Sequence, residues 1–200
     1  MPVLPPRSAS VERTTSETSV RLTLHLDGGD YANQTGVGFL DHMLDLFARH
    51  GGFGLEVACE GDLHVDDHHT VEDVGICLGQ ALREALGDKA HIARYGEATI
   101  PMDEALARAA VDLSGRSYLV FEAAFDRERV GDLSTEMVEH FWRSVAEHAR
   151  LTLHLDVLRG SNVHHRIEAV FKAAARALRT AVSRDPEADP MPSTKGTLSQ

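Results

Sequence analysis

The sequence predicts an α+β fold of two repeated half-domains, each a roughly four-stranded sheet backed by two helices. Three observations support this prediction: segments in which apolar residues alternate, segments in which they recur at helical spacing, and a second half that repeats the order of the first. We expect the halves to pack helix against helix about a pseudo-twofold axis.

The first half reads strand, helix, strand, helix. Apolar residues alternate with polar ones over 20–26, where a glycine pair then supplies a turn, and again over 55–59. Apolar residues at helical spacing predict helices over 41–50 and 70–86, each followed by glycine.

The second half has the same order. A strand is predicted over 119–125, a helix over 139–150, a cleanly alternating strand over 151–157 and a long amphipathic helix over 165–182. The agreement in order indicates that one unit has been duplicated.

Direct comparison of the halves supports the duplication. DHMLDLFARH at 41–50 aligns with EHFWRSVAEH at 139–148, and DDHHTVED at 66–73 aligns with SNVHHRIEA at 161–169. Four segments follow from this comparison. They are an N-terminal arm (1–10), a first half-domain (11–93), a second half-domain (94–185) and a proline-rich C-terminal tail (186–200).

Composition excludes several classes of protein. The longest stretch without a charged residue, 31–40, is too short to span a bilayer, and the first ten residues do not resemble a secretory signal. We therefore expect a soluble, cytoplasmic protein with no membrane partner. A net charge of −11 argues against a nucleic-acid partner. Cys59 and Cys77 lack CxxC spacing, which argues against a disulfide framework and a cysteine-zinc site.

Histidine is the residue type that points to chemistry. The motif His-His-x-x-Glu occurs twice, and in its first copy His68 and Glu72 lie four residues apart, so they share a helix face and can hold one ion. The adjacent His69 points about 100° away, toward a different ion or one completed by another chain. The second copy contains His164, His165 and Glu168.

Two upstream histidines, His42 and His140, extend each copy to a matched set. The eight candidate ligands can form two metal sites of four, with room for water or substrate at octahedral coordination. Imidazole and carboxylate together suit manganese, iron, cobalt or zinc. A single His-His pair is more often an exposed helix start, but the matched spacing of two pairs favours metal binding. The eight residues are His42, His68, His69, Glu72, His140, His164, His165 and Glu168.

The other six histidines carry weaker signals. Four have no matched partner and are expected to be ordinary surface or half-buried residues: His25, His64, His91 and His154. His50 and His148 do align, and they are either helix-end dipole contacts or residues that line the site.

At family level, the chain resembles imidazoleglycerol-phosphate dehydratase from Arg13 to Leu198. The segments that carry the resemblance are GFLDHMLDLFARHGGFGLEV, HHTVEDVGICLGQAL, IPMDEALARAAVDLSGR, HHRIEAVFKAAARAL and PSTKGTL. The phosphatase domain fused to some family members is not evident, so the monofunctional form is expected. The resemblance implies a ribosomal protein S5 domain 2-like fold for each half.

The resemblance implies a hydro-lyase of histidine biosynthesis. Family members remove water from D-erythro-1-(imidazol-4-yl)glycerol 3-phosphate and form 3-(imidazol-4-yl)-2-oxopropyl phosphate. Because no carbonyl activates the C2 hydrogen, two Mn²⁺ ions per active site would bind the ring as imidazolate and assist loss of hydroxide. The family's manganese ligands map onto the eight residues above. We expect each site to combine both repeats, with ligands crossing between subunits of a homo-oligomer, a 24-mer built from trimers.

Substrate contacts and proton transfer are also implied by the resemblance. Glu17 matches a substrate-contacting glutamate and is the first candidate for acid or base chemistry, with Asp103 second. The ligands Glu72 and Glu168, or metal-bound hydroxide, could instead take the proton. The phosphate would be bound by Arg94, Arg116, Lys172, Ser193 and Lys195, the last two in a tail that could close over substrate.

Two other functions fit a duplicated histidine site. A metallohydrolase would use metal-bound hydroxide on a phosphate ester. A metal-storage or metal-sensing protein would hold ions without chemistry, but the candidate phosphate-binding residues argue against it. Incubating metal-loaded protein with imidazoleglycerol phosphate would separate the three, because the dehydratase forms an enolisable ketone and the hydrolase releases inorganic phosphate.

Overall fold

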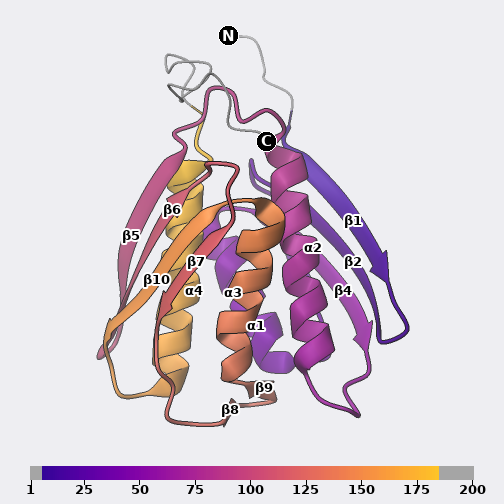
Figure 1. Ribbon diagram of the computed structural model, residues 1–200, viewed down its shortest axis with the longest axis vertical. Helices are drawn as coiled ribbons and strands as arrows, with labels where there is room; N and C mark the ends of the chain where they lie inside the picture. The colour runs from indigo at the N-terminus through magenta and orange to yellow at the C-terminus, as the bar shows by residue number, and fades with distance from the viewer. Residues whose placement is uncertain (1–5, 185–200) are drawn as a thin grey trace.

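Two four-stranded sheets form opposite sides of the molecule, and four helices lie between them (Figure 1). The computed structural model describes residues 6–184. None of the helices in this range is long and apolar enough to cross a lipid bilayer. The α+β prediction with repeated half-domains is confirmed.

The first half forms a sheet in the order β1-β2-β4-β3, with β3 parallel to β4 and the other pairs antiparallel. In β2 every second residue is buried, which is the alternation that the sequence predicts. The elements are β1 (Ser8–Thr14), β2 (Thr18–His25), β3 (Tyr31–Gln34), α1 (Gly38–Gly51), β4 (Gly54–Gly61) and α2 (His68–Leu86).

The second half repeats this plan, with sheet order β5-β6-β10-β7 and a parallel β7–β10 pair. It differs by one small hairpin inserted before its first helix. The elements are β5 (Tyr95–Met102), β6 (Ala105–Asp112), β7 (Tyr118–Glu122), β8 (Arg129–Val130), β9 (Leu133–Ser134), α3 (Glu136–Ala149), β10 (Thr152–Arg159) and α4 (Val163–Ala181).

Several boundaries differ from the sequence prediction. The helix predicted over 139–150 begins at Glu136, and the one predicted over 41–50 begins at Gly38. The added first turns bury apolar side chains, Met137 and Val138 in one helix and Phe39 and Leu40 in the other. The strand predicted over 119–125 ends at Glu122. β1 begins at Ser8, inside the segment predicted to be an arm.

The halves meet through their helices: α2 packs on α3, and α1 packs on α4. The α2–α3 contact is close because α2 presents glycine there. A Cβ on Gly79 would lie 2.7 Å from the carbonyl oxygen of Val145, and one on Gly75 would lie 3.0 Å from that of Phe141. Trp142, which is fully buried, packs between Phe47 of the first half and Phe171 of the second.

The β8–β9 hairpin fastens the beginnings of three helices at one end of the molecule. Asp132 accepts hydrogen bonds from the backbone N–H groups of Gly38 and Phe39 at the start of α1. Asp67, immediately before α2, accepts from the backbone N–H and hydroxyl of Ser134. The hairpin then leads directly into α3. This end of the helix layer carries most of the predicted ligands.

Candidate metal centre

Two clusters of two histidines and one glutamate lie at this end of the helices. In the first cluster, His68 and Glu72 from the start of α2 meet His140 from α3. Nε2 of His140 is 2.9 Å from Oε1 of Glu72, and one ligand atom from each residue lies within 4.8 Å of the others. The three side chains can therefore converge on one ion.

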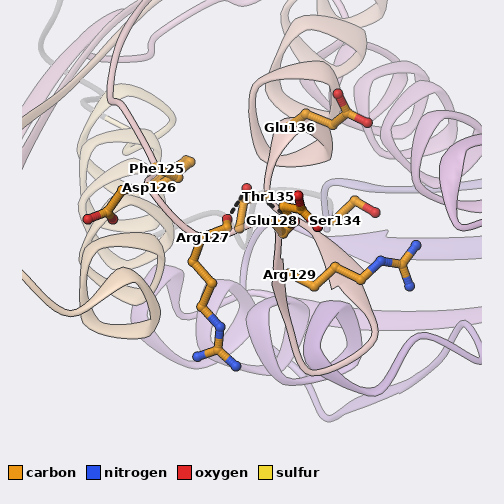
Figure 2. A pocket seen from close by; sticks show the side chains of 8 residues that line it. All are labelled: Phe125, Asp126, Arg127, Glu128, Arg129, Ser134, Thr135 and Glu136. Atoms are coloured by element: carbon orange, nitrogen blue, oxygen red, sulfur yellow. Dashed lines mark hydrogen bonds between the residues drawn. The ribbon is translucent and has the colours of Figure 1, made fainter.

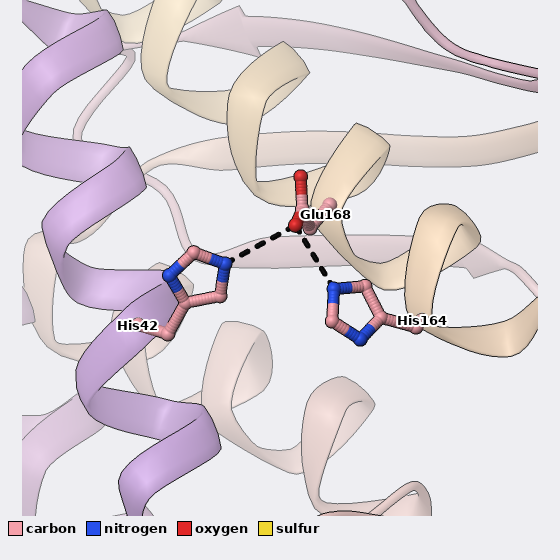
Figure 3. A group of neighbouring side chains, drawn as sticks. All are labelled: His42, His164 and Glu168. Atoms are coloured by element: carbon pink, nitrogen blue, oxygen red, sulfur yellow. Dashed lines mark hydrogen bonds and ion pairs between the residues drawn. The ribbon is translucent and has the colours of Figure 1, made fainter.

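The second cluster contains His42 from α1 and His164 and Glu168 from α4 (Figure 3). Oε1 of Glu168 lies 3.1 Å from Nε2 of His42 and 3.0 Å from Nε2 of His164. The ring of Phe39 packs edge-on against His164 with centroids 4.9 Å apart. The second cluster thus has the same composition as the first.

Each cluster combines both halves of the chain, as the sequence predicts. The HHxxE motif begins a helix in both halves, which places its first histidine and its glutamate one turn apart on the same face. The third residue comes from the paired helix of the other half. Helix pairing between the halves therefore builds both clusters.

Glu168 is held as a carboxylate. Burial by itself would raise its pKa, but hydrogen bonds with Lys172, His42 and His164 lower the pKa to about 2. Nζ of Lys172 is 2.6 Å from Oε2, the oxygen that faces away from the histidines. A charged carboxylate is the form that a metal requires.

The second histidines of the two motifs lie outside the clusters, and each is held by a carboxylate on Nδ1. Nδ1 of His69 is 3.0 Å from Asp62, and Nδ1 of His165 is 2.8 Å from Glu104. Their Nε2 atoms each lie 3.8 Å from another carboxylate. Those partners are Glu17 for His69 and Asp103 for His165.

These contacts shift the pKa values of His69, His165 and Glu104. The hydrogen bond with Asp62 raises the pKa of His69, and that with Glu104 raises the pKa of His165. The hydrogen bond with His165, together with hydrogen bonds from the backbone N–H groups of Asn162 and Ser161, lowers the pKa of Glu104 to about 2. A carboxylate on Nδ1 fixes a histidine so that Nε2 can act as a metal ligand.

Sequence reasoning missed Asp62 and Glu104. They have no common motif, because Asp62 follows β4 whereas Glu104 lies in the β5–β6 turn. Comparison of the two halves therefore gave no signal for either residue. Glu17 and Asp103, by contrast, occupy equivalent hairpins, β1–β2 and β5–β6.

Two predicted phosphate-binding arginines lie away from the clusters of the same chain. The backbone N–H of Arg94 bonds to Ala181 at the far end of α4, about 20 Å along the helix from Glu168. The arginine side chain pairs with Asp112 at 2.7 Å. Arg116 precedes Ser117, whose hydroxyl bonds to Glu147 near the end of α3. Ser193 and Lys195 lie outside the described residues.

A cavity of about 600 Å³ is lined by the loop that leads into α3 and by the start of that helix (Figure 2). Two of its lining residues, Arg129 and Ser134, bond to Asp67, which immediately precedes His68. The remaining lining residues come from the same loop and the start of α3: Phe125, Asp126, Arg127, Glu128, Thr135 and Glu136. The cavity therefore opens beside the beginning of α2.

The two aligned histidines outside the motifs have different surroundings. Nδ1 of His148 lies 3.0 Å from the carbonyl oxygen of Ser144 in its own helix. Burial lowers the pKa of His50, and the charge of Lys172 lowers it further. His148 is therefore a helix contact.

Known proteins resemble the chain over nearly its whole length. The family model described as imidazoleglycerol-phosphate dehydratase matches residues 35–178. The imidazoleglycerol-phosphate dehydratase of Salinibacter ruber is 69% identical over 198 residues, 98% of each chain. That of Streptococcus mutans is 57% identical over 193 residues, 96% of this chain and 100% of the relative.

Solved structures agree with the sequence comparison. The crystal structure of imidazoleglycerol-phosphate dehydratase from Staphylococcus aureus superposes with a TM-score of 0.81 at 47% identity and covers 88% of this chain and 99% of that one. The enzyme from Pyrococcus furiosus gives a TM-score of 0.80 at 35% identity, with 94% and 99% coverage. The likeness extends over both half-domains.

Proposed function

The chain belongs to the imidazoleglycerol-phosphate dehydratase family and is a hydro-lyase of histidine biosynthesis, and from this premise we propose that its two histidine–glutamate clusters bind the Mn²⁺ ions that assist the dehydration. The observation that carries the proposal is the convergence of equivalent donors from both halves, twice, at one end of the helix layer.

The residues present fit such ions. Each cluster offers two imidazole nitrogens and a carboxylate oxygen within 4.8 Å of one another, a donor set suited to Mn²⁺. Three protein ligands leave coordination positions for a further histidine and for substrate. Both described cysteines are buried and lie outside the clusters.

Held by His68, Glu72 and His140 in one cluster and by His42, His164 and Glu168 in the other, the ions would supply Lewis-acid chemistry for loss of the substrate's hydroxyl group. Proton transfer falls to this chain's own carboxylates. Glu17, whose side chain is 49% exposed, and Asp103, 73% exposed, project beside the second histidines, where they can reach a substrate atom. We assign Glu17 first and Asp103 second for acid or base chemistry, with Glu72 and Glu168 as alternative proton acceptors.

The site would be completed by neighbouring copies. His69 and His165 lie outside the two clusters of their own chain, so the Nε2 atom of each can supply a ligand to a cluster of another subunit. Arg94 and Arg116 lie at the far ends of α4 and α3, so phosphate binding by these residues at a cluster also requires a second copy. We propose a homo-oligomer with shared sites, a 24-mer built from trimers, in which Lys172, Ser193 and Lys195 join the arginines on the phosphate.

Replacing either cluster glutamate tests the metal assignment. Glu72→Gln and Glu168→Gln each keep the size of the side chain but remove its charge, so each should lower Mn²⁺ content by about half and reduce turnover by at least about a hundredfold. Metal analysis of the purified protein and formation of the ketone product measure the two effects. Glu139→Gln, on the exposed side of α3, is the matched control and should retain both. Full metal content and activity in both cluster variants would contradict the proposal.

A further inference from the structure

The two clusters are related by the repeat, but the residues one turn beyond their glutamates differ. Glu72 and Glu168 occupy the same position of HHxxE. Four residues further on, α2 carries Ile76 whereas α4 carries Lys172. The ammonium of Lys172 is 2.6 Å from Oε2 of Glu168, while Oε1 faces the two histidines. One ligand carboxylate therefore has a fixed cation bound to it.

The ion pair is shielded from solvent. The side chains of Glu168 and Lys172 are 7% and 14% exposed, and Nζ of the lysine also lies 3.2 Å from Sδ of Met102. Water and salt screen a buried charge far less than an exposed one. Solvent therefore screens the positive charge of Lys172 only weakly, and this charge acts directly on the second cluster.

Among the residues that the structure describes, no such cation is bound to the carboxylate of the first cluster. The side chain of Glu72 is 36% exposed, and within residues 6–184 it forms an ion pair with His140 and with no lysine or arginine. Two arginines form ion pairs with aspartates that are close to these ligands in sequence, Arg13 with Asp73 and Arg129 with Asp67. A divalent cation would therefore meet a negative carboxylate here without a fixed ammonium beside it.

We propose that Lys172 makes the two metal sites unequal, so that in the absence of substrate the His68–Glu72–His140 cluster binds the first Mn²⁺ and the His42–His164–Glu168 cluster binds the second more weakly. The inference rests on the proposed function of the clusters as metal sites. The physical reason is repulsion between the bound ammonium and an incoming dication, together with partial neutralisation of the ligand carboxylate. One lysine thereby sets the order in which the sites fill.

The test is a titration of the metal-free full chain with Mn²⁺. The EPR signal of unbound Mn²⁺ measures how much of the metal has bound at each step. Light scattering on the same samples identifies a protein concentration at which particle size stays constant. The wild-type chain should bind one Mn²⁺ tightly and a second at least about tenfold more weakly. Lys172→Met should strengthen the weak class by about tenfold, so that the two classes approach one another.

Two controls assign the effect to the charge at this position. Arg176→Met removes an exposed positive charge one turn further along α4 and should leave both classes unchanged. Ile76→Lys, which places an ammonium in the equivalent position beside Glu72, should weaken the tight class. Glu72→Gln should abolish the tight class, and Glu168→Gln the weak one.

The outcomes separate this inference from the proposed function. Two equal Mn²⁺ sites in the wild-type chain, or two unequal sites that Lys172→Met leaves unchanged, would overturn the inference and leave the metal assignment standing. Loss of the weak class in Glu72→Gln would reverse the order and also overturn it. A chain that binds no Mn²⁺ would overturn both.

Discussion

At the scale of single residues, the spacing of the HHxxE motif was enough to predict which histidine and glutamate lie together in each cluster. His68 and Glu72, and likewise His164 and Glu168, lie one helical turn apart, and the structure brings each pair to a histidine of the other half. Asp62 and Glu104 could not be found in this way, because they lie in non-equivalent loops and meet their histidines only through the tertiary fold.

Asp62 gives a prediction at this scale. Asp62→Ala removes the carboxylate that fixes the ring of His69, so Mn²⁺ affinity should fall by about 10- to 100-fold. In Asp62→Asn the Mn²⁺ affinity should fall less, because the amide oxygen of the asparagine can still accept a hydrogen bond from Nδ1 of His69. Glu60→Ala, which removes an exposed carboxylate two residues earlier in β4, is the control. Mn²⁺ titration at constant pH measures the affinities, and equal values for the two alanine variants would show that Asp62 does not position the histidine.

At the scale of elements, the strands and helices with clear periodicity were predictable, whereas the β8–β9 hairpin was not. Its strands have only two residues each, too few to show a pattern. The hairpin nonetheless fixes the start of α1, because Asp132 binds the backbone N–H of Gly38, one helical turn before His42. Its loss would therefore affect both stability and the second cluster.

Asp132 also predicts how stability depends on pH. Burial would raise the pKa of Asp132, but hydrogen bonds from the backbone N–H groups of Phe39 and Gly38 outweigh it and lower the pKa. Because the folded pKa is lowered, the stabilisation is fully present above the unfolded value of about 3.9 and is lost as pH falls through the folded pKa.

The corresponding variant is Asp132→Asn. It should lower the free energy of unfolding of the metal-free chain by about 1 kcal/mol at neutral pH, a modest value because the residue is exposed. The difference from wild type should shrink below about pH 4. Urea denaturation over this pH range measures it, with the exposed Asp30→Asn as control. If the difference in the free energy of unfolding persisted unchanged in acid, the charge of Asp132 would not be what stabilises the start of α1.

At the scale of the whole molecule, the duplication could be predicted because both halves retained the histidine spacing and the order of elements. The close α2–α3 contact could not. The need for glycine at Gly75 and Gly79 arises only once α3 is in place, because a Cβ at either position would then lie 3.0 Å or less from a carbonyl oxygen of that helix. The proposed contacts between copies would likewise depend on surfaces that no repeat within one chain specifies.

The proposed sharing of sites between copies predicts complementation. Arg116→Ala and Glu72→Gln should each be nearly inactive when expressed alone. When both variants are co-expressed, mixed particles should regain part of the activity, because some sites then receive an intact arginine from one copy and an intact cluster from another. A co-expressed mixture no more active than the separately prepared variants would contradict shared sites.

The central claim is that the two clusters are the metal sites of this hydro-lyase. Anomalous diffraction at the manganese absorption edge, from crystals of the full chain prepared with Mn²⁺, tests it most directly. We predict two anomalous peaks per chain, one in contact with His68, Glu72 and His140 and the other with His42, His164 and Glu168. Peaks at other residues, or an empty cluster at saturating Mn²⁺, would contradict the account.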